Sequence, residues 1–321
     1  MLIPILLLAV GLVMLLFGGE IFIRGSASLA RRLKVSPIVI GLTVVAFGTS
    51  AAELVVNILA ALHGSPDIAI GNILGSNISN ILLVLGISAM IYPISVKGGT
   101  IWKEIPFGIL ATVILFILSA DLYFGNGIEN VLTRGDGLIL MGFFIIFLYY
   151  TFGLSKVKAD ETEKVKVYSR AMTLFYVLAG LLSLVLGGKL LVDNGVILAR
   201  MWGMSELFIG LTIVAVGTSL PELAASAIAA YHHHDDLAIG NVVGSNIFNV
   251  LWVLGLTPII TPINFNHDAN TDVIIAIGVA SLLFVFMFLG KKGNRYKLKR
   301  WQGAIFIMLY ISYILFITTR G

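Results

Sequence analysis

The sequence predicts an all-α integral membrane protein with about ten transmembrane helices, arranged as two inverted five-helix repeats. Two observations lead to this fold class. Of the 321 residues, 58% are hydrophobic and only 12% are charged, and the charged share is about half that of an ordinary soluble domain. A soluble fold of this length has no interior large enough for so much apolar surface, so lipid must surround much of the chain. The second observation is a long internal repeat.

Ten apolar stretches are long enough to span a bilayer at about 1.5 Å per residue. The first stretch lacks a basic leader and a small-residue cleavage site, so we interpret it as a mature helix and not as a signal peptide. The predicted spans cover residues 3–23, 37–62, 67–92, 102–120, 136–154, 172–192, 206–231, 236–261, 271–290 and 302–318.

The repeat relates the two halves of the chain. Residues 41–80 align with residues 210–249 at a constant offset of 169, without a gap and with 23 of 40 positions identical. Each half then contains five spans, and because five is odd, the second half enters the membrane from the opposite side. Transporters with such inverted repeats bind their cargo at mid-depth, where the repeats meet. The predicted units are a first repeat at 1–154, a cytoplasmic linker at 155–170 and a second repeat at 171–321.

The basic residues set the predicted orientation. With the N- and C-termini outside, 17 of the 21 Lys and Arg residues face the inside, as the positive-inside rule requires. Orientation accounts for the net charge of +4, so we expect no nucleic-acid partner, and nothing in the sequence implies an obligatory protein partner. The expected location is the cell membrane (plasma or inner membrane), where the chain makes multiple passes through the lipid bilayer.

The inverted repeat leads to a topology prediction. Single cysteines at Asp121 and Asp268 should react with a membrane-impermeant thiol reagent from outside, and one at Lys164 only from inside. The chain has no native cysteine, so each signal comes from the introduced residue alone, and disulfides and thiolate metal sites are excluded. Labelling of positions 121 and 164 from the same side would contradict the inverted arrangement.

Two glutamates, Glu53 and Glu222, stand inside apolar spans at matching positions of the repeat. A carboxylate near the bilayer centre is costly and is retained mainly for function. The structural alternatives are a protonated core glutamate or one paired with a cation of the next helix, but the repeat segments have no basic residue at comparable depth. We interpret the two glutamates as ligands of a transported metal cation.

Oxygen-bearing residues accompany both glutamates. A threonine precedes each by four residues and so shares its helical face. Gly48, Gly217 and Pro221 indicate a helix break, and a break at this depth frees backbone carbonyls to line a cavity or bind an ion. The next span of each half carries a polar stripe at a spacing of four, for which helix packing is the alternative interpretation. The candidate residues are Thr49, Thr218, Ser50, Ser219, the carbonyls of Ala46 and Ala215, and the stripes Asn72, Ser76, Asn80 and Asn241, Ser245, Asn249.

An all-oxygen site favours hard cations such as Ca²⁺, and Na⁺ has a similar size. Zinc or copper would favour histidine or cysteine, and no histidine lies deep in a predicted span. The run His232–His234 stands beside Asp235 and Asp236, and we interpret it as a solvated loop, with weak surface metal binding as the alternative. We expect no cofactor.

The duplicated motifs resemble the alpha-repeats of the cation/Ca²⁺ antiporter superfamily, most closely its prokaryotic sodium/calcium exchanger-like branch. The motifs are GTSAAE at 48–53, GTSLPE at 217–222, GNILGSNISN at 71–80 and GNVVGSNIFN at 240–249. The resemblance implies a secondary active antiporter that exchanges Ca²⁺ for Na⁺ across the membrane by alternating access. It also implies Ca²⁺ and Na⁺ ligands at Glu53, Glu222, Thr49, Thr218, Ser50, Ser219, Ser76, Ser245, Ala46 and Ala215, with Asn80 and Asn249 in the polar positions that follow the serines.

The chain departs from some relatives at two places. Asparagine stands at both 80 and 249, where some sodium/calcium exchangers have aspartate in the second copy, and Ala51-Ala52 replaces a common proline. The coupling ion therefore has two candidates, Na⁺ and the proton, the latter giving a proton-coupled Ca²⁺ or other divalent-cation antiporter. A cation channel is the alternative from a different class. The sequence has no HExxH, catalytic triad at depth or cofactor motif, so we expect no enzyme.

Overall fold

The computed structural model describes residues 2–63, 66–124, 129–155, 166–203, 215–265, 267–291 and 295–320. Within these ranges, eight helices are long and apolar enough to cross a membrane, and a bent pair, Pro37–Thr49 with Glu53–Leu62, makes a ninth candidate. The predicted helical membrane fold is therefore confirmed. The seventh predicted span, 206–231, lies partly outside the described residues, so the count of ten stays a prediction.

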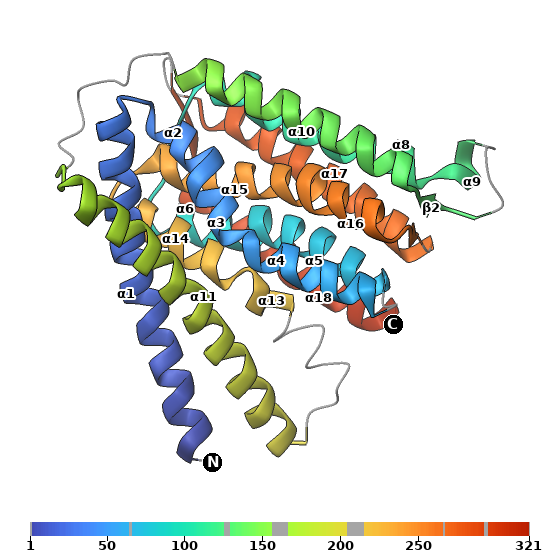
Figure 1. Ribbon diagram of the computed structural model, residues 1–321, viewed down its shortest axis with the longest axis horizontal. Coiled ribbons are helices and arrows are strands. Elements are labelled where there is room, and N and C mark those ends of the chain that lie inside the picture. The colour runs from blue at the N-terminus through green and yellow to red at the C-terminus, as the bar shows by residue number, and fades with distance from the viewer. Residues whose placement is uncertain are drawn as a thin grey trace.

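The elements follow the predicted spans closely, with several spans divided into two or three helical segments (Figure 1). Their bounds are α1 (Leu2–Leu33), α2 (Pro37–Ile40), η1 (Gly41–Val45), α3 (Ala46–Thr49), α4 (Ala51–Leu62), α5 (Pro66–Ser79), η2 (Asn80–Val84), α6 (Leu85–Ile91), β1 (Ile94–Lys97), α7 (Gly98–Trp102), α8 (Glu104–Ser119), α9 (Asp121–Phe124), β2 (Val131–Leu132), α10 (Arg134–Ser155), α11 (Arg170–Met201), α13 (Ala215–Thr218), α14 (Leu220–Tyr231), α15 (Asp235–Phe248), η4 (Asn249–Val253), α16 (Leu254–Ile260), β3 (Ile263–Asn264), α17 (His267–Leu289), β4 (Arg295–Leu298) and α18 (Arg300–Arg320).

The helices α1 and α11 are each 32 residues long and extend side by side away from the remaining helices (Figure 1). They run antiparallel, because Gly11 faces the backbone of Gly187 whereas Gly25 faces Tyr176. Both helices continue about ten residues beyond the predicted spans. Where the extension of α1 begins, Arg24 forms an ion pair with Glu20 one turn earlier, with Nε and Oε1 2.6 Å from each other.

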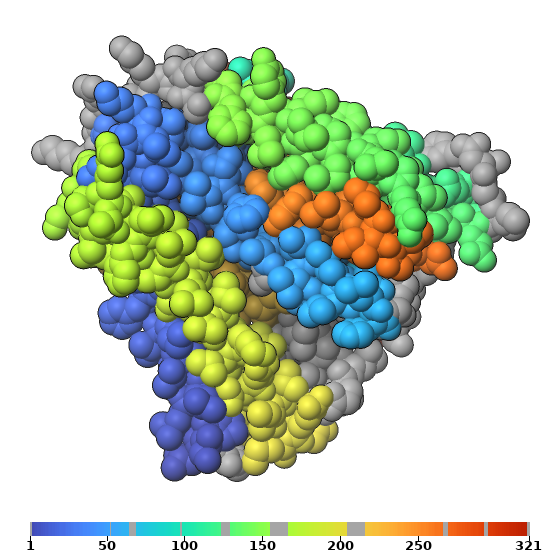
Figure 2. Space-filling view, in the orientation of Figure 1, coloured from blue at the N-terminus to red at the C-terminus, as the bar shows by residue number. Residues whose placement is uncertain are grey.

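The spans that carry the polar stripes form the centre of the molecule. In the most apolar window of Asp235–Ile260, 89% of residues are buried, and the value for Ala69–Ile91 is 78%, against 22% for α1. The outer helices expose large apolar side chains such as Ile145 and Leu59, as lipid-facing surfaces do. On the face shown in Figure 2, α4 lies between α11 and α16, and α16 lies against α10.

The backbone of α15 packs closely on the first half of the chain. The Cα atom of Gly41 lies 3.0 Å from the position that a Cβ on Gly240 would occupy, and a Cβ on Gly244 would lie 2.7 Å from Cβ of Ala46. Only glycine permits so close an approach. The segment α2–η1–α3 is therefore held directly against α15, which positions the residues next to the first helix break.

Two short antiparallel strand pairs were not predicted. Strand β1 pairs with β4, and β2 pairs with β3. The strands have between two and four residues, too few to show the alternating pattern by which strands are recognised in a sequence. They join loops at the ends of spans and leave the helical architecture unchanged.

Candidate functional site

The two glutamates lie directly after matching breaks in their helices. Helix α3 ends at Thr49 and α4 begins at Ala51, while Ser50 between them has φ −77° and ψ 0°. In the second half Ser219 separates α13 from α14 with φ −90° and ψ 5°. Both serines thus leave the helical conformation, and each glutamate occupies the first turn of the next helix.

A second irregularity begins at the asparagines of the polar stripes. The π-helical segment η2 begins at Asn80, and η4 begins at Asn249. π-Helical turns insert one extra residue into an α-helix and are frequent at functional sites. Segment η2 packs against α14, which carries Glu222, and η4 packs against α4, which carries Glu53. Each asparagine therefore starts a distorted turn beside the glutamate helix of the other half.

Thr49 connects the first break to the second half. Its hydroxyl donates to Asn241 Oδ1 at 3.2 Å and lies 3.3 Å from Ser245 Oγ. Thr49, Ser50 and Ser245 are the hydroxyl side chains next to the Glu222 carboxylate, and Glu222 is in turn close enough to Glu53 for the two carboxylates to interact. The candidate residues of the two halves therefore meet in one place.

Several oxygen atoms at this place are buried without a hydrogen-bond partner among the described residues. Glu53 and Glu222 have no exposed surface. None of their four carboxylate oxygens accepts a hydrogen bond of regular geometry from the described residues, although the hydroxyls of Thr49, Ser50 and Ser245 lie beside Glu222. Five further oxygens also have no hydrogen-bond partner in the described part of the chain, namely Oγ of Ser50, Ser76 and Ser219 and Oδ1 of Asn80 and Asn249. Buried polar atoms are normally hydrogen-bonded, because an unmade bond costs about 1–3 kcal/mol. These nine buried oxygens, four of them carboxylate, belong to segments that pack against one another, and oxygens are the ligands that a desolvated hard cation requires.

The remaining predicted ligands are placed less completely. The carbonyl of Ala46 already accepts a hydrogen bond from Ser50 N at 2.9 Å, so only part of its acceptor capacity is left. Thr218 is partly buried. The backbone of Ala215 begins α13, and its side chain lies outside the described residues.

A family model described as sodium/calcium exchanger protein matches residues 3–153 and 172–319 of this chain. The chain belongs to the sodium/calcium exchanger protein family. It is 40% identical to the putative antiporter CaxA of Alkalimonas amylolytica, over 98% of each chain. It is also 25% identical to the Ca²⁺/H⁺ antiporter ChaA of Bacillus subtilis, over 71% of this chain and 69% of the relative. A solved structure of the sodium-calcium exchanger NCX_Mj matches it with a TM-score of 0.84 and 32% identity, covering 98% of each chain.

Membership of the exchanger family places the chain among transporters. The candidate site has only two carboxylates, and no group of three or more His, Cys, Asp or Glu side chains in the described ranges is arranged to hold a metal ion. Most of the oxygens are therefore neutral. Such a donor set suits an ion that must be released again better than one that stays bound.

Sequence reasoning missed two further pairs of polar residues in this exchanger-family chain, and the first is Asn57 and Ser226, the partners of Asn72 and Asn241 from the polar stripes. Asn72 Nδ2 donates to Asn57 Oδ1 at 3.1 Å, and at the repeat-related positions Asn241 Nδ2 donates to Ser226 Oγ at 2.8 Å. These bonds fix each glutamate helix to the next span. A signal was present, because Asn57 and Ser226 follow the glutamates by four residues. The second pair, Asn77 and Asn246, is treated below.

The histidine run differs from the solvated loop that the sequence predicts. His232 is partly buried, and its Nε2 lies 2.6 Å from Glu20 Oε2 of α1. The His233 ring lies 3.9 Å from the ring of Tyr92, centroid to centroid. These contacts join the α14–α15 loop to α1 and to the end of α6, so the loop has a structural role as well as a solvated surface.

Proposed function

We propose that this exchanger-family protein is a secondary active antiporter that moves Ca²⁺ against Na⁺ across the membrane by alternating access. The observation that carries the proposal is the pair of fully buried glutamates, Glu53 and Glu222, at matching helix breaks. Two unpartnered carboxylates in one apolar setting repel each other and lose their hydration. A cation between them removes both costs, and release of the cation restores them.

The formal charge of the site supports these two ions. Glu53 and Glu222 contribute −2, because the side chains of Asn80 and Asn249 are neutral. One Ca²⁺ or two Na⁺ neutralise this charge, whereas a third Na⁺ leaves +1. One site thus accepts either Ca²⁺ or Na⁺, so occupation by one excludes the other. The resemblance to sodium/calcium exchangers implies three Na⁺ per Ca²⁺, and exchange at that ratio responds to membrane voltage.

The proposal is tested by separating the two possible driving ions. We expect an outward Na⁺ gradient to drive Ca²⁺ uptake into proteoliposomes when the pH is equal on both sides and a protonophore short-circuits proton leaks. Uptake should saturate with Ca²⁺ and should respond to a potential set with K⁺ and valinomycin. Absence of uptake in this assay, with uptake under an imposed proton gradient, would overturn sodium coupling.

Proton-coupled exchange of Ca²⁺ or another divalent cation on the same scaffold is the second candidate. The similarity to ChaA favours it. Asparagine at 249, where some sodium/calcium exchangers have aspartate, is compatible with either coupling ion. Inhibition by acid does not separate the two mechanisms, because protons compete with cations for a pair of carboxylates in either case. A cation channel, in contrast, would carry a Ca²⁺ flux that does not depend on a counter-transported ion.

A further inference from the structure

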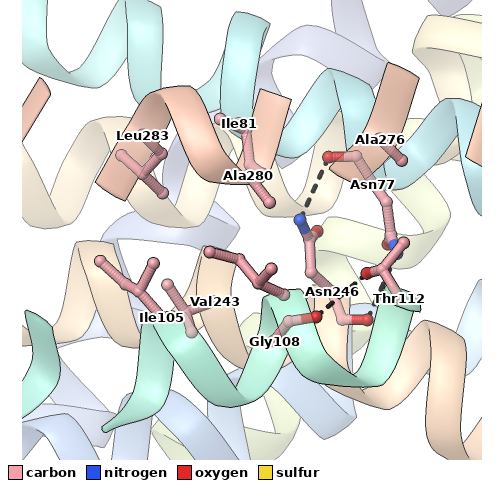
Figure 3. Close-up of a pocket in the computed structure, with 11 residues that line it drawn as sticks. Asn77, Ile81, Ile105, Gly108, Thr112, Val243, Asn246, Ala276, Ala280 and Leu283 are labelled. Atoms are coloured by element: carbon pink, nitrogen blue, oxygen red, sulfur yellow. Dashed lines mark hydrogen bonds between the residues drawn. The ribbon is translucent and has the colours of Figure 1, made fainter. Parts of the chain in front are cut away.

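Four asparagines form a reciprocal network between the repeat-related spans. Asn77 Nδ2 donates to the backbone oxygen of Asn246 at 3.3 Å, and Asn246 Nδ2 donates to the backbone oxygen of Asn77 at 3.1 Å (Figure 3). In addition, Asn80 Nδ2 donates to Asn246 Oδ1 at 3.0 Å, and Asn249 Nδ2 donates to Asn77 Oδ1 at 3.1 Å. We name these four residues the asparagine clasp.

The chemistry of the donors and acceptors fixes every amide in the clasp. A backbone carbonyl only accepts hydrogen bonds, so the end of the Asn77 amide that faces Asn246 O must be its NH₂ group. The Asn77 carbonyl oxygen then faces Asn249, and Asn249 must offer its NH₂ group in return. The same sequence of constraints runs from the backbone of Asn77 through Asn246 to Asn80. In both halves the backbone therefore determines which atom of the outer amide, that of Asn80 or Asn249, makes no hydrogen bond within the clasp.

The amide atoms that make no hydrogen bond within the clasp are oxygens. Oδ1 of Asn80 and Oδ1 of Asn249 are both buried without a hydrogen-bond partner in the described structure. Their segments pack against the helices of Glu222 and Glu53, respectively. If either amide were reversed, it would present its positively polarised NH₂ group in place of an oxygen, and a cation would be repelled.

We propose that Asn77 and Asn246 are positioning residues that hold Asn80 and Asn249 in the orientation in which their amides bind a cation. The inference rests on the proposed transport function. Asn77 acts through Asn249, and Asn246 acts through Asn80, so each half of the chain orients a ligand of the other half. Neither positioning residue is needed as an ion ligand itself.

A cavity of about 20 Å³ beside the clasp supplies a matched control. Asn77, Asn246 and Thr112 line it, together with apolar residues of α8, α15 and α17 (Figure 3), and neither glutamate does. Among the described residues, Thr112 Oγ1 donates to the backbone oxygen of Gly108 in its own helix, at 3.0 Å, and makes no hydrogen bond to the clasp. Thr112→Val therefore changes the same cavity and leaves all four amides in place.

The test is a set of double-mutant cycles on the purified protein in proteoliposomes, with the KM for Ca²⁺ and the maximal rate measured separately. Asn77→Ala should raise KM about tenfold, the factor that one hydrogen-bond-sized interaction of about 1.4 kcal/mol supplies, with little change in the maximal rate. In the Asn249→Ala background Asn77→Ala should add nothing, because the amide it orients is gone. In the Asn80→Ala background it should still raise KM about tenfold. Asn246→Ala should add nothing in the Asn80→Ala background and should raise KM about tenfold in the Asn249→Ala background.

Each other outcome decides against the clasp. An equal effect of Asn77→Ala in both backgrounds, or an equal effect of Thr112→Val, would show a general structural role. Asn77→Ser replaces the alanine variant if that variant does not fold. Ca²⁺-induced stabilisation against heat, measured on the same variants in detergent, tests the cycle through binding alone. This binding measurement does not require transport, so it tests the clasp even if the wild-type protein shows no Na⁺-driven uptake.

Discussion

Glu53→Gln and Glu222→Gln should each reduce Ca²⁺ uptake nearly to the level of empty vesicles while the protein remains folded. The amide keeps the size of the side chain but removes one of the two charges. Two unit charges about 4 Å apart interact by about 4 kcal/mol at an effective dielectric constant of 20, a factor of about 10³ in affinity, and the effect on a divalent ion is larger. Uptake of ⁴⁵Ca²⁺ under an outward Na⁺ gradient measures the loss of transport in each variant.

Stability without Ca²⁺ separates an ion ligand from a structural residue. Both glutamates are buried without hydrogen-bond partners in the described structure, so neutralising one relieves repulsion and should leave the thermal unfolding temperature equal or higher. Glu104→Gln is the matched control. Glu104 is also buried, at 2% exposure, and its Oε2 likewise has no hydrogen-bond partner in the described structure, but Tyr150 OH donates to its Oε1. Glutamine retains that acceptor, and Glu104 is not one of the proposed ion ligands, so uptake should be unchanged.

The neutral ligands should matter less than the charged ones. Ser76→Ala or Ser245→Ala removes an uncharged oxygen, so each variant should retain measurable uptake with a raised KM. Uptake at the wild-type rate in Glu53→Gln would mean that this mid-membrane glutamate is structural, and it would remove the main support for the proposed cation site.

Sequence reasoning identified the features that depend on residue types that are rare within apolar membrane spans. Glu53 and Glu222 stand out because an apolar span rarely contains a carboxylate. Gly48, Gly217 and Pro221 indicated breaks, and the helices do end one residue after the two glycines, at Thr49 and Thr218. Both inferences needed only the local sequence and the repeat.

Other features depend on contacts that no local pattern encodes. No particular sequence marks the π-helical turns at Asn80 and Asn249, so a spacing of four describes each stripe only as far as these residues. Asn77 and Asn246 were visible as identical letters of the repeat. Their function, however, requires knowing that residues 169 positions apart touch. The lengths of α1 and α11 were underestimated because charged residues end an apolar run without ending a helix.

Paired contacts at repeat-related positions support the inverted arrangement that the sequence predicts. Gly11 faces Gly187, and the counterparts of these residues at the offset of 169, Gly180 and Gly18, also face each other's helices. The asparagine clasp follows the same rule. Contacts that map onto themselves when the halves are exchanged are those expected around a two-fold axis. The labelling experiment on positions 121, 164 and 268 remains the direct test.

Gly244→Ala should reduce Ca²⁺ affinity by about 100-fold, although glycine 244 itself offers no ligand, because a displacement of about 1 Å at a binding constellation has effects of this size. The added Cβ would lie 2.7 Å from Cβ of Ala46 and 2.9 Å from the backbone of Leu42. Helix α15 must then move away from α3, and the contacts of Thr49 with Asn241 and Ser245, at 3.2 and 3.3 Å, lengthen with it. The KM for Ca²⁺ uptake and the Ca²⁺-induced rise in unfolding temperature both measure the loss.

Two further variants show whether the displacement is the cause. Ala46→Gly removes the opposing Cβ and keeps the backbone carbonyl, so Gly244→Ala combined with Ala46→Gly should recover part of the lost affinity. Gly142→Ala adds the same methyl group in α10, where the glycine is exposed and a Cβ meets no atom within 4 Å, and it should behave as wild type. If Gly244→Ala keeps the wild-type affinity, the site does not depend on the close approach of α15 to α3. If the double variant is no better than Gly244→Ala, the loss has another origin than the Ala46 contact.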